Sequence, residues 1–167
     1  LEVVQRAGET VFVPSGWWHQ VLNKGDTISI NHNWANEFNL HHLYARLRSD
    51  LDAVEYALRD VKDMDGFEEQ AQVVLKADSG TDYRAFFGFV KHVAQVYVDQ
   101  ACNGRGHQGL LQFDEYFRSR PSVKRALVRI QSVLGLLSED PATKHIEGLS
   151  GEICGLRDTV ASAISEC

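Results

Sequence analysis

The stretch GETVFVPSGWWHQVLNKGDTISINHN, residues 8–33, contains the strand and turn signals that decide the fold. β-Branched and aromatic residues dominate positions 10–13, which is typical of a strand. The Pro-Ser-Gly sequence at 14–16 then predicts a turn, because proline fixes φ and glycine tolerates a positive φ. We expect a second strand to leave this turn with His19 near its start. After a reversal at the following Lys-Gly pair, residues 26–33 return as a third strand.

Side-chain alternation divides the third strand into a polar face and a mainly apolar face. The polar face holds Thr27, Ser29, Asn31 and Asn33, and the other face holds Ile28, Ile30, His32 and Trp34. One interpretation places the polar face on the solvated outside of a hairpin. The other makes it the wall of a polar cavity, with the isoleucine face packed under helices. The long amphipathic helix that follows needs a sheet to cover, which favours the cavity.

A change of apolar period after Asn36 predicts that the remainder of the chain is helical. The first stripe has three- and four-residue steps and predicts a helix of about six turns, capped by Asn36 or Asn39. Its members are Leu40, Leu43, Tyr44, Leu47, Leu51, Val54, Leu58 and Val61. Further helices are expected over 67–77, from a cap at Thr81 or Asp82 onwards, over 110–117, from Pro121 to about 137, and over 152–165 with Ser150 as its cap. The helix from Pro121 has the apolar stripe Val123, Leu127, Ile130, Leu134 and Leu137, and the last helix has the stripe Ile153, Leu156, Val160 and Ile164.

These patterns predict an α+β chain of two parts. Residues 1–35 form the strands and residues 36–167 form a helical C-terminal region. Three or four strands cannot close a barrel by themselves. Because the chain does not begin with Met and opens inside a strand-like run, we expect it to be truncated at its N-terminus.

Composition excludes several classes of function. The chain has 167 residues, 44% of them hydrophobic and 24% charged, which is ordinary for a globular protein. Its net charge of −6 argues against non-specific binding to nucleic acid. No apolar run approaches the roughly 20 residues that span a bilayer, so no membrane partner is expected. Three cysteines without metal-ligand spacing fit a reducing compartment, and we expect a cytoplasmic protein with plain thiols.

Five spaced residues indicate a family. The pattern G-x5-P-x-G-x2-H-x3-N is met by Gly8, Pro14, Gly16, His19 and Asn23. It resembles the second motif of the cupin-type double-stranded β-helix. Together with the continuation TISINHNW, the stretch resembles the JmjC branch of the iron(II)- and 2-oxoglutarate-dependent oxygenases. Within that branch it is most similar to enzymes that hydroxylate a lysine of the eukaryotic translation release factor.

The resemblance implies a fold, a metal and a co-substrate. The strands would be the C-terminal strands of a double-stranded β-helix, and His19 would be the distal histidine ligand of iron(II). Asn31 would hydrogen-bond the distal carboxylate of 2-oxoglutarate, and Asn33 would lie near the metal. His32 would point away. The other two ligands would form a His-x-Asp or His-x-Glu pair upstream, and no such pair precedes His19. We therefore expect this chain not to hold catalytic iron by itself, because a single imidazole binds iron(II) weakly.

The resemblance also implies an activity and a partner, and two classes of function stay open. The first is the C-terminal part of a 2-oxoglutarate-dependent protein hydroxylase that acts on a translation release factor, with this chain inactive alone. The second is a non-catalytic cupin-like interaction module. A cupin isomerase or sugar-binding protein shares the spacing but lacks the TISINHNW continuation and the helical tail. That tail has three candidate roles: covering the sheet, shaping the access of the substrate, or forming a homodimer interface.

Overall fold

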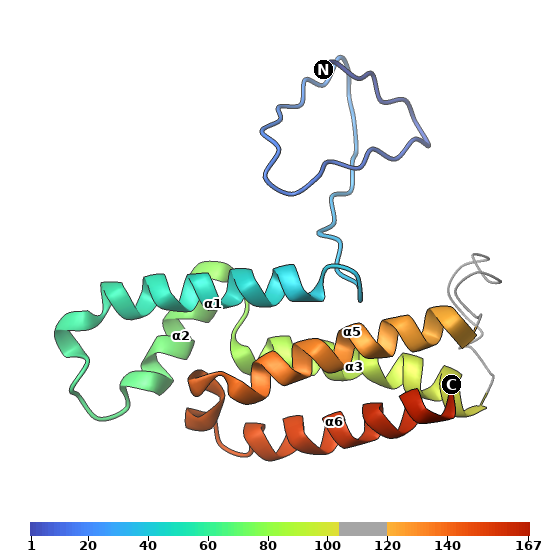
Figure 1. Ribbon diagram of the computed structural model, residues 1–167. Coiled ribbons are helices and arrows are strands. Elements are labelled where there is room, and N and C mark those ends of the chain that lie inside the picture. The colour runs from blue at the N-terminus through green and yellow to red at the C-terminus, as the bar shows by residue number, and fades with distance from the viewer. Residues whose placement is uncertain (104–119) are drawn as a thin grey trace. The chain divides into compact units, whose positions relative to one another are not determined.

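The computed structural model describes residues 1–103 and 120–167 in two units, Leu1–Asn33 and Trp34–Cys167 (Figure 1). The first unit is an irregular chain of turns and bends. The described residues of the second unit form helices joined by short turns and connecting segments. Each unit has its own internal contacts and is described by itself.

The expected strands are absent from the described part of the chain, so the predicted α+β class with double-stranded β-helix strands was wrong. The predicted Pro-Ser-Gly turn at 14–16 is nevertheless present, residues 24–26 form only a bend, and a further turn lies at residues 6–9. Glu9 N–H donates to the Arg6 carbonyl at 3.1 Å, with Gly8 at φ +82° as the third residue of the turn. A positive φ at the third position is what a type II turn requires. The local turn chemistry was therefore predicted correctly, whereas the pairing between strands was not.

The physical reason lies in what a sheet needs beyond local propensity. A ribbon of two or three strands is marginal in water unless an apolar face is covered. In Leu1–Asn33 every side chain except that of Pro14 is exposed, and Ile28 and Ile30 are 98% and 86% accessible. No apolar burial therefore offsets the entropy of ordering the backbone into a ladder. A high β-propensity means that a side chain packs well on a half-buried, pleated sheet surface, and this unit contains no such surface.

The second unit consists of five described α-helices and two short 3-10 helices (Figure 1). Their bounds are α1 Leu40–Ala57, η1 Arg59–Val61, α2 Phe67–Ser79, α3 Tyr83–Asn103, α5 Arg120–Glu139, η2 Pro141–His145 and α6 Leu149–Glu166. The helix expected over 110–117 falls outside the described residues. Among the described helices, none combines the length and apolarity that crossing a membrane needs.

Helices α3, α5 and α6 pack against one another, and α1 packs against α2 and α5 (Figure 1). The predicted stripe of α5 is confirmed, because all five of its members are at most 3% exposed. They are Val123, Leu127, Ile130, Leu134 and Leu137. The stripe of α6 is confirmed as well, with its first three members buried and the last half-buried. A single apolar core runs through all five helices.

Helix ends show which capping predictions were right. The Asp82 carboxylate accepts from the Ala85 N–H at 2.7 Å and caps α3 as predicted. Helix α1 ends at Ala57, earlier than its apolar stripe suggested, and the last predicted member of that stripe, Val61, lies in a 3-10 turn and is exposed. Ser150 does not cap α6, because Gly148 occupies the N-cap position at φ +72°. Glycine is the residue that adopts this left-handed conformation without strain.

Candidate functional site

The predicted iron ligand lies just after a tight turn. Trp17 N–H donates to the Pro14 carbonyl at 3.2 Å, and Gly16 adopts φ +80° at the third position. The Nδ1 atom of His19 lies 3.1 Å from the Trp17 carbonyl oxygen. Because a carbonyl can only accept, this contact assigns the ring hydrogen to Nδ1 and leaves the lone pair on Nε2. Metal-ligating histidines commonly show this arrangement, with the other ring nitrogen donating to a backbone carbonyl.

The other predicted residues of that site are not gathered around His19. Asn31 and Asn33 are exposed, and among the described residues no hydrogen bond joins either of them to the histidine. Trp17 and Trp18 are 61% and 102% exposed, so neither packs over the ring. Within the described residues, no cluster of three or more His, Cys, Asp or Glu side chains could hold a metal ion. The roles given to His19, Asn31 and Asn33 remain predictions.

A buried carboxylate joins three helices in the second unit, and the sequence did not reveal it. Asp140, whose side chain is 2% exposed, accepts from the Tyr83 hydroxyl at 2.6 Å and from the Tyr44 hydroxyl at 2.8 Å. Its other oxygen accepts from Ala142 N–H at 3.0 Å and from Arg48 at 3.4 Å. These partners lie on α1, α3 and η2. Every partner donates a hydrogen bond, so these contacts replace the water that the buried carboxylate has lost.

The two tyrosines of this cluster are held in their neutral form. Burial raises the pKa of Tyr83 above its ordinary value of 10.0, and the hydrogen bond to Asp140 and its negative charge raise it further. Burial and the same carboxylate raise the pKa of Tyr44 in the same direction. Both hydroxyls therefore remain donors at neutral pH. The cluster has the chemistry of a structural anchor, because its acceptor is already saturated with donors.

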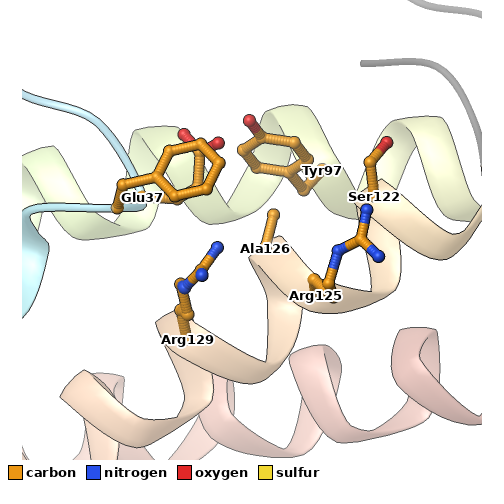
Figure 2. A pocket seen from close by; sticks show the side chains of 7 residues that line it. Glu37, Tyr97, Ser122, Arg125, Ala126 and Arg129 are labelled. Atoms are coloured by element: carbon orange, nitrogen blue, oxygen red, sulfur yellow. The ribbon is translucent and has the colours of Figure 1, made fainter. Parts of the chain in front are cut away.

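A second polar group lines a cavity of about 180 Å³ in the same unit (Figure 2). Its lining residues are Glu37 and Phe38 before α1, Tyr97 on α3, and Ser122, Arg125, Ala126 and Arg129 on α5. Glu37 is 6% exposed, whereas both arginines are exposed. Burial raises the pKa of Tyr97, and the adjacent Glu37 carboxylate raises it further. The Arg129 guanidinium lies 4.4 Å from the centroid of the Phe38 ring.

One signal in the sequence could have indicated this cavity. Arg125 and Arg129 are four residues apart on one helix, and neither has an acidic residue four positions away. Like charges at this spacing destabilise a helix unless another group compensates them. Glu37, which lines the same cavity, is about ninety positions earlier in the chain and could not be paired with them from the sequence.

Comparison with known proteins places the N-terminal unit in a family. The JmjC domain, described as a hydroxylase domain, matches residues 1–34. The chain is 45% identical over 105 residues to the 2-oxoglutarate and iron-dependent oxygenase JMJD4 of Gallus gallus, covering 62% of this chain and 25% of that protein. It is 38% identical over 137 residues to the Drosophila melanogaster homolog of that oxygenase, covering 82% of this chain and 32% of the relative.

Other relatives have different names. The chain is 46% identical over 111 residues to the arginine-specific demethylase JMJ20 of Arabidopsis thaliana, covering 62% of this chain and 24% of that protein. No solved structure matches the chain. The chain thus spans a quarter to a third of the length of these relatives. Its residues 1–34 belong to the JmjC domain family, and the chain is a homologue of proteins named 2-oxoglutarate and iron-dependent oxygenases.

Proposed function

We propose that this chain is the C-terminal part of an iron(II)- and 2-oxoglutarate-dependent protein hydroxylase. The observation that carries the proposal is the JmjC match over residues 1–34, which includes the Pro-Ser-Gly turn and His19. The names of the relatives from chicken and fly support the same metal and co-substrate.

This chain would contribute one ligand, His19, to the proposed iron(II) site. A neutral imidazole suits iron(II), and the contact between Nδ1 and the Trp17 carbonyl leaves Nε2 of His19 free to coordinate. The turn fixes the backbone on which the ring is mounted, since Trp17 N–H is bonded to the Pro14 carbonyl. Because the described residues offer no cluster of three ligands, the remaining ligands of the proposed site would come from elsewhere in the enzyme.

Asn31 and Asn33 would act on the co-substrate side of the same site. The amide of Asn31 can donate to the distal carboxylate of 2-oxoglutarate, and that of Asn33 can orient a group beside the metal. When bound, the iron supplies the redox chemistry that couples oxidative decarboxylation of 2-oxoglutarate to hydroxylation of a carbon–hydrogen bond. The contribution of this chain is to hold and orient one ligand and to bind a carboxylate.

For the substrate, we propose a lysine side chain of a translation release factor, in a cytoplasmic protein. The motif resemblance of residues 8–34 supports this choice. A second candidate is a methylated arginine, favoured by the 46% identity to a protein named as an arginine-specific demethylase. Mass spectrometry separates the two, because lysyl hydroxylation keeps the added oxygen on the peptide, whereas demethylation removes a methyl group as formaldehyde.

The metal-ligand assignment is tested in the full-length enzyme that contains this chain. His19→Ala should lower turnover of 2-oxoglutarate by about 100-fold or more, since even groups that only orient a metal ligand cost 10–100-fold when removed. His32→Ala is the matched control, because it removes another exposed histidine of the same unit that lies outside the G-x5-P-x-G-x2-H-x3-N spacing, and it should retain most of the activity. Equal turnover by the His19→Ala variant and the unmodified enzyme would eliminate the assignment.

A non-catalytic interaction module is the alternative, and the absence of a His-x-Asp pair before His19 favours it. Both readings predict that the purified 167-residue chain holds no stoichiometric iron(II). They differ for the full-length protein, in which only the hydroxylase proposal expects iron-dependent consumption of 2-oxoglutarate. Stoichiometric iron in the 167-residue chain would contradict the inference that a single imidazole is all that this chain contributes.

A further inference from the structure

The cavity lined by residues of α3 and α5 presents two arginine side chains (Figure 2). Arg125 and Arg129 extend from neighbouring turns of α5, and among the described residues neither guanidinium takes part in an ion pair. Arg129 is stacked on the ring of Phe38, which fixes the plane of its guanidinium but leaves the outward N–H groups available. Two such cations four residues apart repel each other, and a bound anion would relieve that repulsion.

Glu37 adds a negative charge to the lining of the same cavity. This residue is 6% exposed, and its carboxylate is close enough to the Tyr97 phenol to act on it electrostatically. With two arginines and one glutamate, the formal charge of the cavity lining is +1. A monoanion, such as N-acetyl-L-valine or a peptide with a free C-terminal carboxylate, therefore neutralises the lining. A zwitterionic free amino acid leaves it at +1, and a phosphate dianion would overshoot and be repelled by Glu37. The buried carboxylate accepts a hydrogen bond from the Tyr97 phenol, and a ligand that offers a positively charged or N–H donor would give it a second partner.

The size and walls of the cavity limit the ligand further. Its volume of about 180 Å³ is roughly six times the ~30 Å³ that one water molecule occupies in the liquid. That space suits a ligand of the size of one amino acid. The rings of Phe38 and Tyr97 and the methyl group of Ala126 supply apolar wall. A small apolar side chain could therefore lie against them while polar groups at either end are paired.

We propose that this cavity binds an α-carboxylate with an adjacent N–H donor, as found in a free α-amino acid and at a polypeptide C-terminus, with a small apolar side chain such as that of valine. Arg125 and Arg129 take the carboxylate, and Glu37 takes the N–H group. The proposal rests only on residues of the unit Trp34–Cys167, so it stands or falls independently of the oxygenase proposal.

The proposal is tested by titrating the 167-residue chain with L-valine and following the side-chain N–H signals of isotope-labelled arginines. L-Valine should shift the signals of Arg125 and Arg129 and saturate, whereas L-valinamide, which lacks the carboxylate, should bind at least about tenfold more weakly. Arg125→Ala should weaken binding of valine to a similar extent. Lys124→Ala is the matched control, because it removes one exposed cation from the same turn of α5 without changing the cavity lining, and it should leave the affinity unchanged.

The variant Glu37→Gln separates the two ends of the site. It should weaken L-valine, whose ammonium loses a charged partner, more than N-acetyl-L-valine, which carries only a neutral N–H donor. A tripeptide that ends in valine with a free carboxylate tests the polypeptide source against its amidated form. Arginine-dependent binding of either the free amino acid or the free-ended peptide supports the proposal and assigns the source.

Three results would overturn the proposal. The first is the absence of saturable binding for both L-valine and the free-ended peptide. The second is equal affinity for L-valine and L-valinamide, which would show that the carboxylate is not recognised. The third is tighter binding of inorganic phosphate than of the monoanion N-acetyl-L-valine, because the charge argument would then be wrong.

Discussion

Replacement of Asp140 by alanine is the most demanding test of how the helical unit is held together. The variant removes the acceptor for two tyrosine hydroxyls, Tyr44 and Tyr83, and for the Ala142 N–H, and it leaves Arg48 without its buried partner. A hydrogen bond to a charged group contributes about 1.5–3 kcal/mol, and a helix cap contributes about 1 kcal/mol. These contributions overlap, because removing one carboxylate ends all of them together. Since the carboxylate is 2% exposed, solvent does not replace it.

We therefore expect Asp140→Ala to lower the free energy of unfolding by about 4 kcal/mol, which is two or three hydrogen bonds to a buried carboxylate, reduced because they overlap. Asp140→Asn should cost about 2 kcal/mol, because asparagine caps a helix about as well as aspartate and keeps one acceptor oxygen. The Arg48 contact adds little to these figures, since that side chain is 35% exposed and its ion pairs are partly screened.

The assay is urea unfolding of the 167-residue chain, followed by the helical circular dichroism signal. Asp52→Ala is the control, because Asp52 pairs with the same arginine at 2.6 Å but is 57% exposed, and it should cost less than about 0.5 kcal/mol. A double-mutant cycle of Asp140→Ala with Tyr83→Phe should show a coupling energy of about 1–2 kcal/mol. If Asp140→Ala cost less than about 1 kcal/mol, the view of Asp140 as an anchor between helices would be refuted.

Three further predictions concern the same unit. The pKa values of Tyr44, Tyr83 and Tyr97 in the folded chain are raised above 10.0, so above about pH 10 the folded chain keeps protons that the unfolded chain loses. These groups should therefore leave the free energy of unfolding unchanged below about pH 10 and lower it above that pH. Equal urea midpoints at pH 8 and pH 11 would contradict this prediction. Leu134→Ala, at 0% exposure, should cost about 3 kcal/mol in urea unfolding, against almost nothing for the 48%-exposed Val128→Ala. Gly80→Ala should lower the free energy of unfolding by about 1 kcal/mol, because a φ of +79° is strained for any residue with a Cβ. No neighbouring atom would clash with the added methyl group, so the cost comes from the backbone alone. A higher melting temperature of the variant would disprove the strain.

The helices could be predicted because their signals are local. The stripe of α5 recurs at helical spacing, and burial of all its members follows from that period. Capping was less predictable, as Ser150 and Gly148 illustrate. Both are acceptable helix starts in sequence, and the choice depends on the path of the chain from η2 into α6.

The strands could not be predicted correctly because a strand is not a local structure. Residues 10–13 and 26–33 have the composition of strands, and the turns beside them formed as expected. Pairing requires a neighbouring backbone and a covered face, and the first unit provides neither for Ile28 and Ile30. The predicted role of His19 depends on the motif and not on pairing, so it remains open to the test proposed above.

The sequence by itself determined the helical periods, the glycine turns, and the family to which residues 1–34 belong, because each of these depends on residues close together in the chain. Only the tertiary structure decided that Asp140 meets Tyr44 and Tyr83, and that Glu37 faces the cavity lined by Arg125 and Arg129. Those groups are dozens of residues apart, and no period or spacing connects them. They come together because burying the apolar stripes of α1, α3 and α5 against each other brings the polar residues at the margins of those stripes into contact.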